Sequence, residues 1–212
     1  MKRTSGVVML GRYRAALLVG SALTAIMVPQ WASAQTTWIG TTSDWSEPTN
    51  WTNAVPTDAT PTTIDGTAVG GAQLTTEDGK AGSLTQSAQS LDLNGKNLSV
   101  TGGYALGGGS LAAGSSTITA GEMTVGGTGT VDGNGYNINA TSTFTVQDTG
   151  AVTGTGTINT NTFTMTGGTV GADVTVNATT SNVSGGSGGK YVNSGTYTVT
   201  GTVGASSFEN KA

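Results

Sequence analysis

The acidic side chains are the main candidates for catalysis in this sequence, because it contains no histidine and no cysteine. That composition excludes a Ser-His-Asp triad, a thiolate nucleophile and the usual zinc sites. Glycoside hydrolysis would need two carboxylates about 5–9 Å apart across a sugar. Asp132, Asp148 and Asp173 are the acids that a repeating fold could bring to one face. Their unequal spacings do not match one repeat, so we expect three separate, solvated corner residues.

Three further patterns have chemical interpretations. Glu77-Asp78-Gly79 is typical of an exposed turn. The stretch 126–132 is similar to the calcium-binding nonapeptide G-G-x-G-x-D, but its aspartate falls one residue late and the motif is not repeated in tandem. Thr-x-Thr stripes suggest an ice-binding face, although their spacing along the chain is irregular and threonine is a good strand residue. These stripes are Thr143/Thr145, Thr153/Thr155/Thr157 and Thr162/Thr164/Thr166. We therefore predict no catalytic residue, cofactor or metal ion.

The N-terminal residues have the pattern of a secretory signal peptide. Four cationic residues within the first 14 precede an apolar run from Ala15 to Val28, and Ala32-Ser33-Ala34 follows it. The run is shorter than the roughly 20 residues that a membrane-crossing helix needs. We predict a signal peptide over residues 1–34, cleaved between Ala34 and Gln35. An uncleaved membrane anchor is the alternative.

Removal of this leader changes the charge balance of the chain. The remaining 178 residues keep four lysines against all twelve acids, a net charge of −8. Lys80, Lys96, Lys190 and Lys211 are too scattered to form a basic patch for a phosphate backbone, so we expect no nucleic-acid partner. We also expect no integral membrane segment in the mature chain. Without disulfides, the core must come from side-chain packing.

Beyond residue 60 the sequence alternates apolar and polar residues in short segments, which indicates half-buried strands. One unit recurs: an aromatic residue or Met, then Thr, then Val or Met, then a glycine-bearing turn and a valine. It begins at Met123, Phe144, Phe163 and Tyr197, so that the first two intervals are similar and the third is much longer. A period near 20, with one irregular excursion through the Gly-rich stretch 184–189, is typical of a solenoid.

This repeat predicts an all-β fold, a right-handed parallel β-helix of about seven turns over residues 62–212. Five residues are predicted to point inward: Val125, Phe144, Val146, Phe163 and Met165. A β-sandwich is the alternative, because Asn94-Gly95 and Asp132-Gly133 also resemble hairpin turns. An unstructured chain is a third possibility, which the regularly spaced β-branched and aromatic residues disfavour.

Residues 35–61 differ from the rest in containing Trp38, Trp45 and Trp51, followed by Val55-Pro56. This W-x6-W-x5-W pattern, with the basic leader and the Thr/Gly/Asn repeats, resembles the start of bacterial autotransporter passenger domains. The resemblance implies a β-helical passenger secreted through a C-terminal outer-membrane β-barrel. The sequence departs from the family in showing no barrel strands before Ala212. It is then either a truncated passenger or a short exported relative.

The tryptophans have two interpretations. The end of a β-helix exposes apolar core and unpaired strand groups, and large aromatic residues are suited to covering it. We therefore predict that residues 35–61 form an N-terminal cap. Alternatively, the three rings form a platform on which sugars stack.

These observations favour an exported, non-enzymatic, adhesin-like surface protein of a Gram-negative bacterium. It is expected at the cell surface, in the outer membrane or outside the cell, or in the periplasm if no barrel partner exists. Glycans or proteins on host or neighbouring cells are the expected partners. The alternative is a secreted β-helical carbohydrate-active enzyme or sugar-binding module.

Overall fold

The computed structural model describes residues 34–201, 204 and 207–211, so the predicted signal peptide lies outside the described residues except for Ala34. Regular structure in the described part consists of strands and one short 3-10 helix, η1 (Pro48–Asn50). The strands are β1 (Thr36–Thr37), β2 (Pro61–Ile64), β3 (Ala72–Gln73), β4 (Gly79–Ala81), β5 (Ser83–Gln86), β6 (Ser90–Asp92), β7 (Leu98–Leu106), β8 (Ser110–Gly114), β9 (Thr117–Val125), β10 (Thr130–Val146), β11 (Ala151–Val152), β12 (Thr155–Met165), β13 (Thr169–Val183), β14 (Ser187–Val199) and β15 (Ser207–Asn210).

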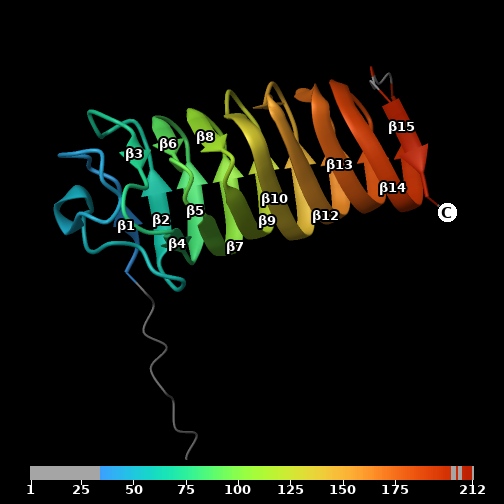
Figure 1. Ribbon diagram of the computed structural model, residues 1–212. Helices are drawn as coiled ribbons and strands as arrows, with labels where there is room; N and C mark the ends of the chain where they lie inside the picture. Colours follow the sequence, from blue (N-terminus) through green and yellow to red (C-terminus); the bar gives the residue numbers. More distant parts are fainter. Residues whose placement is uncertain (1–33, 202–203, 205–206, 212) are drawn as a thin grey trace, which may run out of the picture. The chain divides into compact units, whose positions relative to one another are not determined.

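These strands coil into a parallel β-solenoid of about eight turns, which confirms the predicted fold class and adds about one turn to the predicted count (Figure 1). Each turn, or rung, contributes to three faces. Face 1 contains β1, β2, β5 and the last parts of β7, β9, β10, β12, β13 and β14. Face 2 contains β3, β6, β8, β11 and the first parts of β10, β13 and β14. Face 3 contains β4 and β15, the first parts of β7, β9 and β12, and the middle parts of β10, β13 and β14.

The inward side chains of face 1 stack in two columns, because parallel pairing places equivalent residues one above another. One column continues through Thr62, Leu84, Tyr104, Met123, Phe144, Phe163, Ser181 and Tyr197. The other contains Ile64, Gln86, Leu106, Val125, Val146, Met165, Val183 and Val199. All five residues predicted to point inward are fully buried.

Face 3 completes the core with a column of mostly β-branched residues: Leu98, Ile118, Ile138, Ile158, Val176 and Tyr191. Burying one such side chain contributes roughly 1.5–3 kcal/mol. Face 2 supplies Leu91, Leu111, Val131, Val152 and Val170. The alternation of these residues with outward polar ones is the period-2 pattern in the sequence.

The long interval between Phe163 and Tyr197 covers two rungs and is not a break in the repeat. Ser181 pairs with Phe163 on one side and Tyr197 on the other, in the inward aromatic column. Its hydroxyl donates a hydrogen bond of 3.1 Å to the buried Asn193 Oδ1. A polar residue therefore occupies an aromatic position, which hides this rung from the sequence pattern.

The N-terminal segment adds strands to the same stack. β1 pairs in register with β2, which makes it a further rung of face 1. Asp44 forms a parallel bridge with Gln73, the last residue of β3 on face 2. Residues 36–45 thus lie on the first turn of the solenoid and follow its register.

Candidate functional site

The three aspartates suggested by the sequence are exposed, as expected, but the register does not bring them together. Asp132 lies in β10 on face 2 rather than at a corner, and its Oδ1 accepts a 2.9 Å hydrogen bond from Thr153 Oγ1. Asp148 occupies the corner after face 1, with a φ of 56°. Asp173 lies in β13 between the parts of that strand that belong to faces 2 and 3.

The register places a different acid near Asp132. Asp92 pairs with Ala112, which pairs with Asp132, so the two carboxylates share one outward column. Two rungs separate their Cα atoms by roughly 9.5 Å, at the upper end of the carboxyl separation of about 6.5–9.5 Å in inverting glycosidases. Sequence reasoning missed Asp92, although its distance from Asp132 along the chain is twice the repeat length.

The other acidic patterns are structural. Asp78 Oδ1 accepts a 2.8 Å hydrogen bond from the backbone N–H of Asn97, and both Glu77 and Asp78 are exposed as predicted. Gly79 is not part of an exposed turn, because it is buried and begins β4. The calcium-like stretch 126–132 forms the corner after β9 and the start of β10. Among the described residues, no group of three or more acidic side chains could hold a metal ion.

Two of the acids line hollows on face 1. Glu122 lines one of about 310 Å³ with Ser83 and Gly103. Asp148 lines another of about 280 Å³ with Gln147. Ala105 and Thr124 line both hollows. The two hollows therefore adjoin at Ala105, whose outward side chain is only a methyl group.

Threonine stacks from rung to rung along face 1, although its spacing along the chain is irregular. Of the three Thr-x-Thr stripes, Thr153/Thr155/Thr157 lies outside this face. One outward column contains Thr37, Thr63, Thr85, Ala105, Thr124, Thr145, Thr164, Asn182 and Thr198. A second contains Thr143, Thr162, Thr180 and Thr196. Rungs of unequal length conceal this order in the sequence. The ice-binding interpretation remains a hypothesis, which a thermal hysteresis measurement would test.

Asparagine stacks in the same way on the outer side of face 3. Asn139, Asn159 and Asn177 occupy equivalent positions in three successive rungs. Asn159 Nδ2 donates to Asn139 Oδ1 at 3.0 Å and to Asn137 Oδ1 at 2.8 Å. Asn177 Nδ2 donates to Asn159 Oδ1 at 2.9 Å. We call Asn139, Asn159 and Asn177 the amide ladder.

The amide ladder forms one wall of an open groove along the solenoid. Two adjoining hollows, of about 400 and 260 Å³, share Asn159, Thr160 and Thr179. The remaining lining residues are Asn139, Ala140, Thr141 and Asn161 in the first hollow and Asn177, Ala178, Val192 and Ser194 in the second. None of these residues is ionisable. We call the two hollows together the amide groove.

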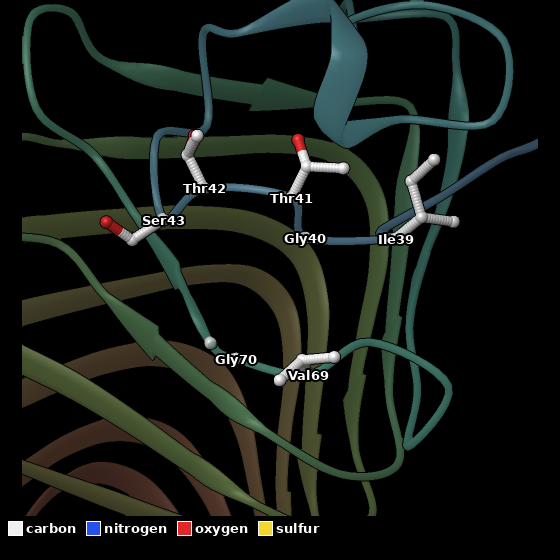
Figure 2. Close-up of a pocket in the computed structure, with 8 residues that line it drawn as sticks. Ile39, Gly40, Thr41, Thr42, Ser43, Val69 and Gly70 are labelled. Carbon is white, nitrogen blue, oxygen red and sulfur yellow. The ribbon is translucent and has the colours of Figure 1, made fainter.

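A third region, at the N-terminal end, is a hollow of about 550 Å³ between the loops 39–43 and 69–71 (Figure 2). Ile39 and Val69 line it and are exposed, at 40% and 97% of their surface. Thr41, Thr42 and Ser43 follow Ile39 on the same loop, and the hydroxyl groups of Thr41 and Thr42 are hydrogen-bonded to Asn50. Ile39 and Val69 therefore give the hollow exposed apolar surface from both loops.

Asn50 fixes the loop 39–43, which forms one side of this hollow. Its side chain is fully buried, and its Oδ1 accepts hydrogen bonds of 2.8 Å from Thr41 Oγ1 and the backbone N–H of Thr42. Its Nδ2 donates to the Asp44 carbonyl at 2.7 Å. The Asp44 carboxylate is itself a hydrogen-bond acceptor, and the hydroxyl of Thr75 and the N–H and hydroxyl of Ser46 lower its pKa.

The three tryptophans are buried, with 0–4% of their surface exposed, which rules out an open platform for sugars. Trp51 makes edge-to-face contacts with Trp38 and Trp45, at ring-centroid distances of 5.1 and 4.8 Å. The indole N–H of Trp51 donates to the Trp45 carbonyl at 2.7 Å. Their position beside the first turn supports the capping interpretation.

The amide ladder is the feature that sequence reasoning missed most clearly. Asn139, Asn159 and Asn177 recur at intervals close to the repeat length, which is a usable signal. The repeat is recognised by its apolar residues, however, and these point inward. A repeat defined by inward apolar residues gives no information about the outward residues that lie between them.

Comparison of the chain with models of known protein families, with curated proteins and with solved structures finds no match. Any inference about function therefore rests on the fold and on these outer surfaces. Within the described residues, no helix has the length and apolarity to cross a membrane.

Proposed function

We propose that this protein is an exported, non-enzymatic surface protein of the autotransporter-passenger type, which binds glycans or proteins on host or neighbouring cells. One observation carries the proposal: faces 1 and 3 present uncharged hydroxyl and amide side chains that recur from rung to rung. Such an array can form many weak hydrogen bonds at once with a repetitive surface, and multivalent contact raises avidity. The signal-peptide pattern and the passenger resemblance support export.

Binding is tested by incubating the purified protein with a glycan array and with intact cells. Proteins with Thr145→Lys and Thr164→Lys, or with Asn159→Lys, place a charge on face 1 or face 3 at outward positions. We expect at least one of these variants to lose binding while it remains folded, as shown by a cooperative thermal transition. Failure of the unmodified protein to bind any glycan or cell would contradict the proposal.

Export is tested by N-terminal sequencing of protein recovered from the periplasm, the medium and the cell surface. We expect the mature chain to begin at Gln35, because the small residues Ala32 and Ala34 precede the predicted cleavage site. A mature chain that begins at Met1 would contradict export by a cleaved leader. Protease treatment of intact cells then separates a surface location from a periplasmic one.

A carbohydrate-active enzyme is the second candidate, and the Asp92 and Asp132 column is the observation that favours it. Neither aspartate lines any of the hollows described above. We therefore expect no turnover when the protein is incubated with uronate-containing and neutral glycans. Cleavage of any glycan that is abolished by changing Asp92, Asp132, Asp148 or Asp173 to Asn would establish the enzyme instead.

A further inference from the structure

We infer that the amide groove binds a neutral, extended chain of β-1,4-linked N-acetylated amino sugars that runs along the solenoid axis. The inference rests on the proposed function, because it names the ligand of one outer face. It is carried by the hydrogen-bonding groups that the amide ladder leaves unused, by their spacing and by the absence of charge in the groove.

The unused groups alternate along the ladder. A side-chain amide has two N–H donors and an oxygen with two lone pairs. Asn159 spends both donors on Asn137 and Asn139, and keeps one lone pair. Within the described part of the chain, Asn139 makes no hydrogen bond as a donor through its side chain, and Asn177 uses one of its two donors. Free N–H groups therefore occur two rungs apart, with an acceptor between them.

This alternation matches a β-1,4-linked chain. One rung of about 4.7–4.9 Å is close to the length that one sugar residue adds to such a chain when it is extended. Successive residues in the chain face opposite ways, so substituents on the same side recur at every second residue. Acetamido groups facing the protein would then meet the free N–H groups of Asn139 and Asn177.

The chemistry of the acetamido group fits the amide ladder. Its carbonyl accepts from a free asparagine N–H, and its N–H donates to a free asparagine oxygen, so it extends the existing amide network. Val192 lines the groove with apolar surface for the C–H faces of the sugars, whereas the methyl groups of Ala140 and Ala178 are buried in the core beneath it. Thr141, Thr179 and Ser194 place hydroxyl groups on the second wall.

The groove disfavours two other classes of ligand. A polyuronate or phosphate polymer finds no cation among the lining residues, so the cost of removing its charges from water is not offset. An extended peptide also carries amides, but its repeat of about 3.3 Å per residue, or about 6.6 Å per pair, does not match the rungs.

The test is isothermal titration of the purified protein with the hexamer of β-1,4-linked N-acetylglucosamine. Cellohexaose has the same linkage without acetamido groups and serves as the ligand control. We expect the N-acetylated hexamer to bind at least about tenfold more tightly than cellohexaose. Co-sedimentation with insoluble chitin and with peptidoglycan sacculi shows which natural source of this sugar chain the groove accepts, and binding to either supports the inference.

Two variants locate the binding. Thr179→Trp fills the part of the groove that both hollows share, from an exposed position, and should abolish binding. Asn177→Asp removes both N–H donors of this side chain, the free one and the one bonded to Asn159, and should weaken binding about tenfold. The matched controls are Thr128→Trp and Asn134→Asp, at exposed positions between the faces that line none of the hollows described above, and they should bind normally.

Equal affinity for cellohexaose, or unchanged binding by Thr179→Trp with its fold intact, would overturn the inference. Melting temperatures show which variants fold. If the protein binds cells or other glycans but not the N-acetylated hexamer, the inference fails and the proposed function stands. If the protein binds nothing, both fail.

Discussion

At the scale of single residues, Phe144 shows how strongly the core depends on its columns. Its ring is fully buried and stacks on Phe163 at a centroid distance of 6.3 Å. We predict that Phe144→Asp lowers the free energy of unfolding by several kcal/mol, because truncating a buried Phe costs about 3–5 kcal/mol and an unpaired buried charge adds to that. Urea denaturation measures the change.

Phe144→Leu is the matched control for this prediction. It keeps an apolar side chain in the column and should cost far less than the aspartate, because leucine buries no charge and leaves only a small cavity. A melting temperature for Phe144→Asp equal to that of the unmodified protein would rule out the inward column.

At the scale of elements, the corners between faces require glycine at some positions. Gly154, before β12, has a φ of 79°, and a Cβ there would lie 1.8 Å from the Gly133 carbonyl oxygen of the previous rung. Gly95 has a similar φ of 76° with open space around it. We predict that Gly95→Ala costs roughly 1–2 kcal/mol from backbone strain alone.

Gly154→Ala should cost clearly more than Gly95→Ala, because the corner must also move away from the rung before it. Thermal denaturation of the two variants gives the comparison. Equal losses would show that close stacking of the corners contributes nothing beyond the backbone conformation.

At the scale of the whole molecule, three buried tyrosines make the solenoid sensitive to alkali. Burial raises the pKa of Tyr104, Tyr136 and Tyr191 above the ordinary value of 10. Above about pH 10 the unfolded chain loses these protons while the folded chain keeps them, so folding stability falls as pH rises. The slope should approach about 1.4 kcal/mol per pH unit for each tyrosine.

Tyr104→Phe isolates one of these contributions. The Tyr104 hydroxyl donates a 2.6 Å hydrogen bond to the buried Gln86 Oε1, so the variant should be less stable at neutral pH. Its stability should nevertheless fall less steeply above pH 10, as measured by urea denaturation at several pH values. A slope unchanged by the substitution would show that Tyr104 ionises equally in both states.

The sequence by itself determined the class of fold and the identity of much of the core. The side-chain period of two is a local property of a strand, so Val125, Phe144 and Met165 could be assigned inward from their immediate neighbours. The regular return of the apolar unit then required stacked parallel turns. The inventory of residue types, without histidine or cysteine, likewise limited the possible chemistry.

Only the tertiary structure decided which residues share an outer column. Successive inward residues of face 1 from Thr62 to Tyr197 are separated by unequal stretches of chain, so counting along the sequence by a fixed period locates a column only to within a few residues. The strand register decides both that Asp92 lies in the column of Asp132 and that Asn139 stacks on Asn159. The physical reason is that corners absorb insertions and deletions, whereas backbone hydrogen bonds keep the strands in register.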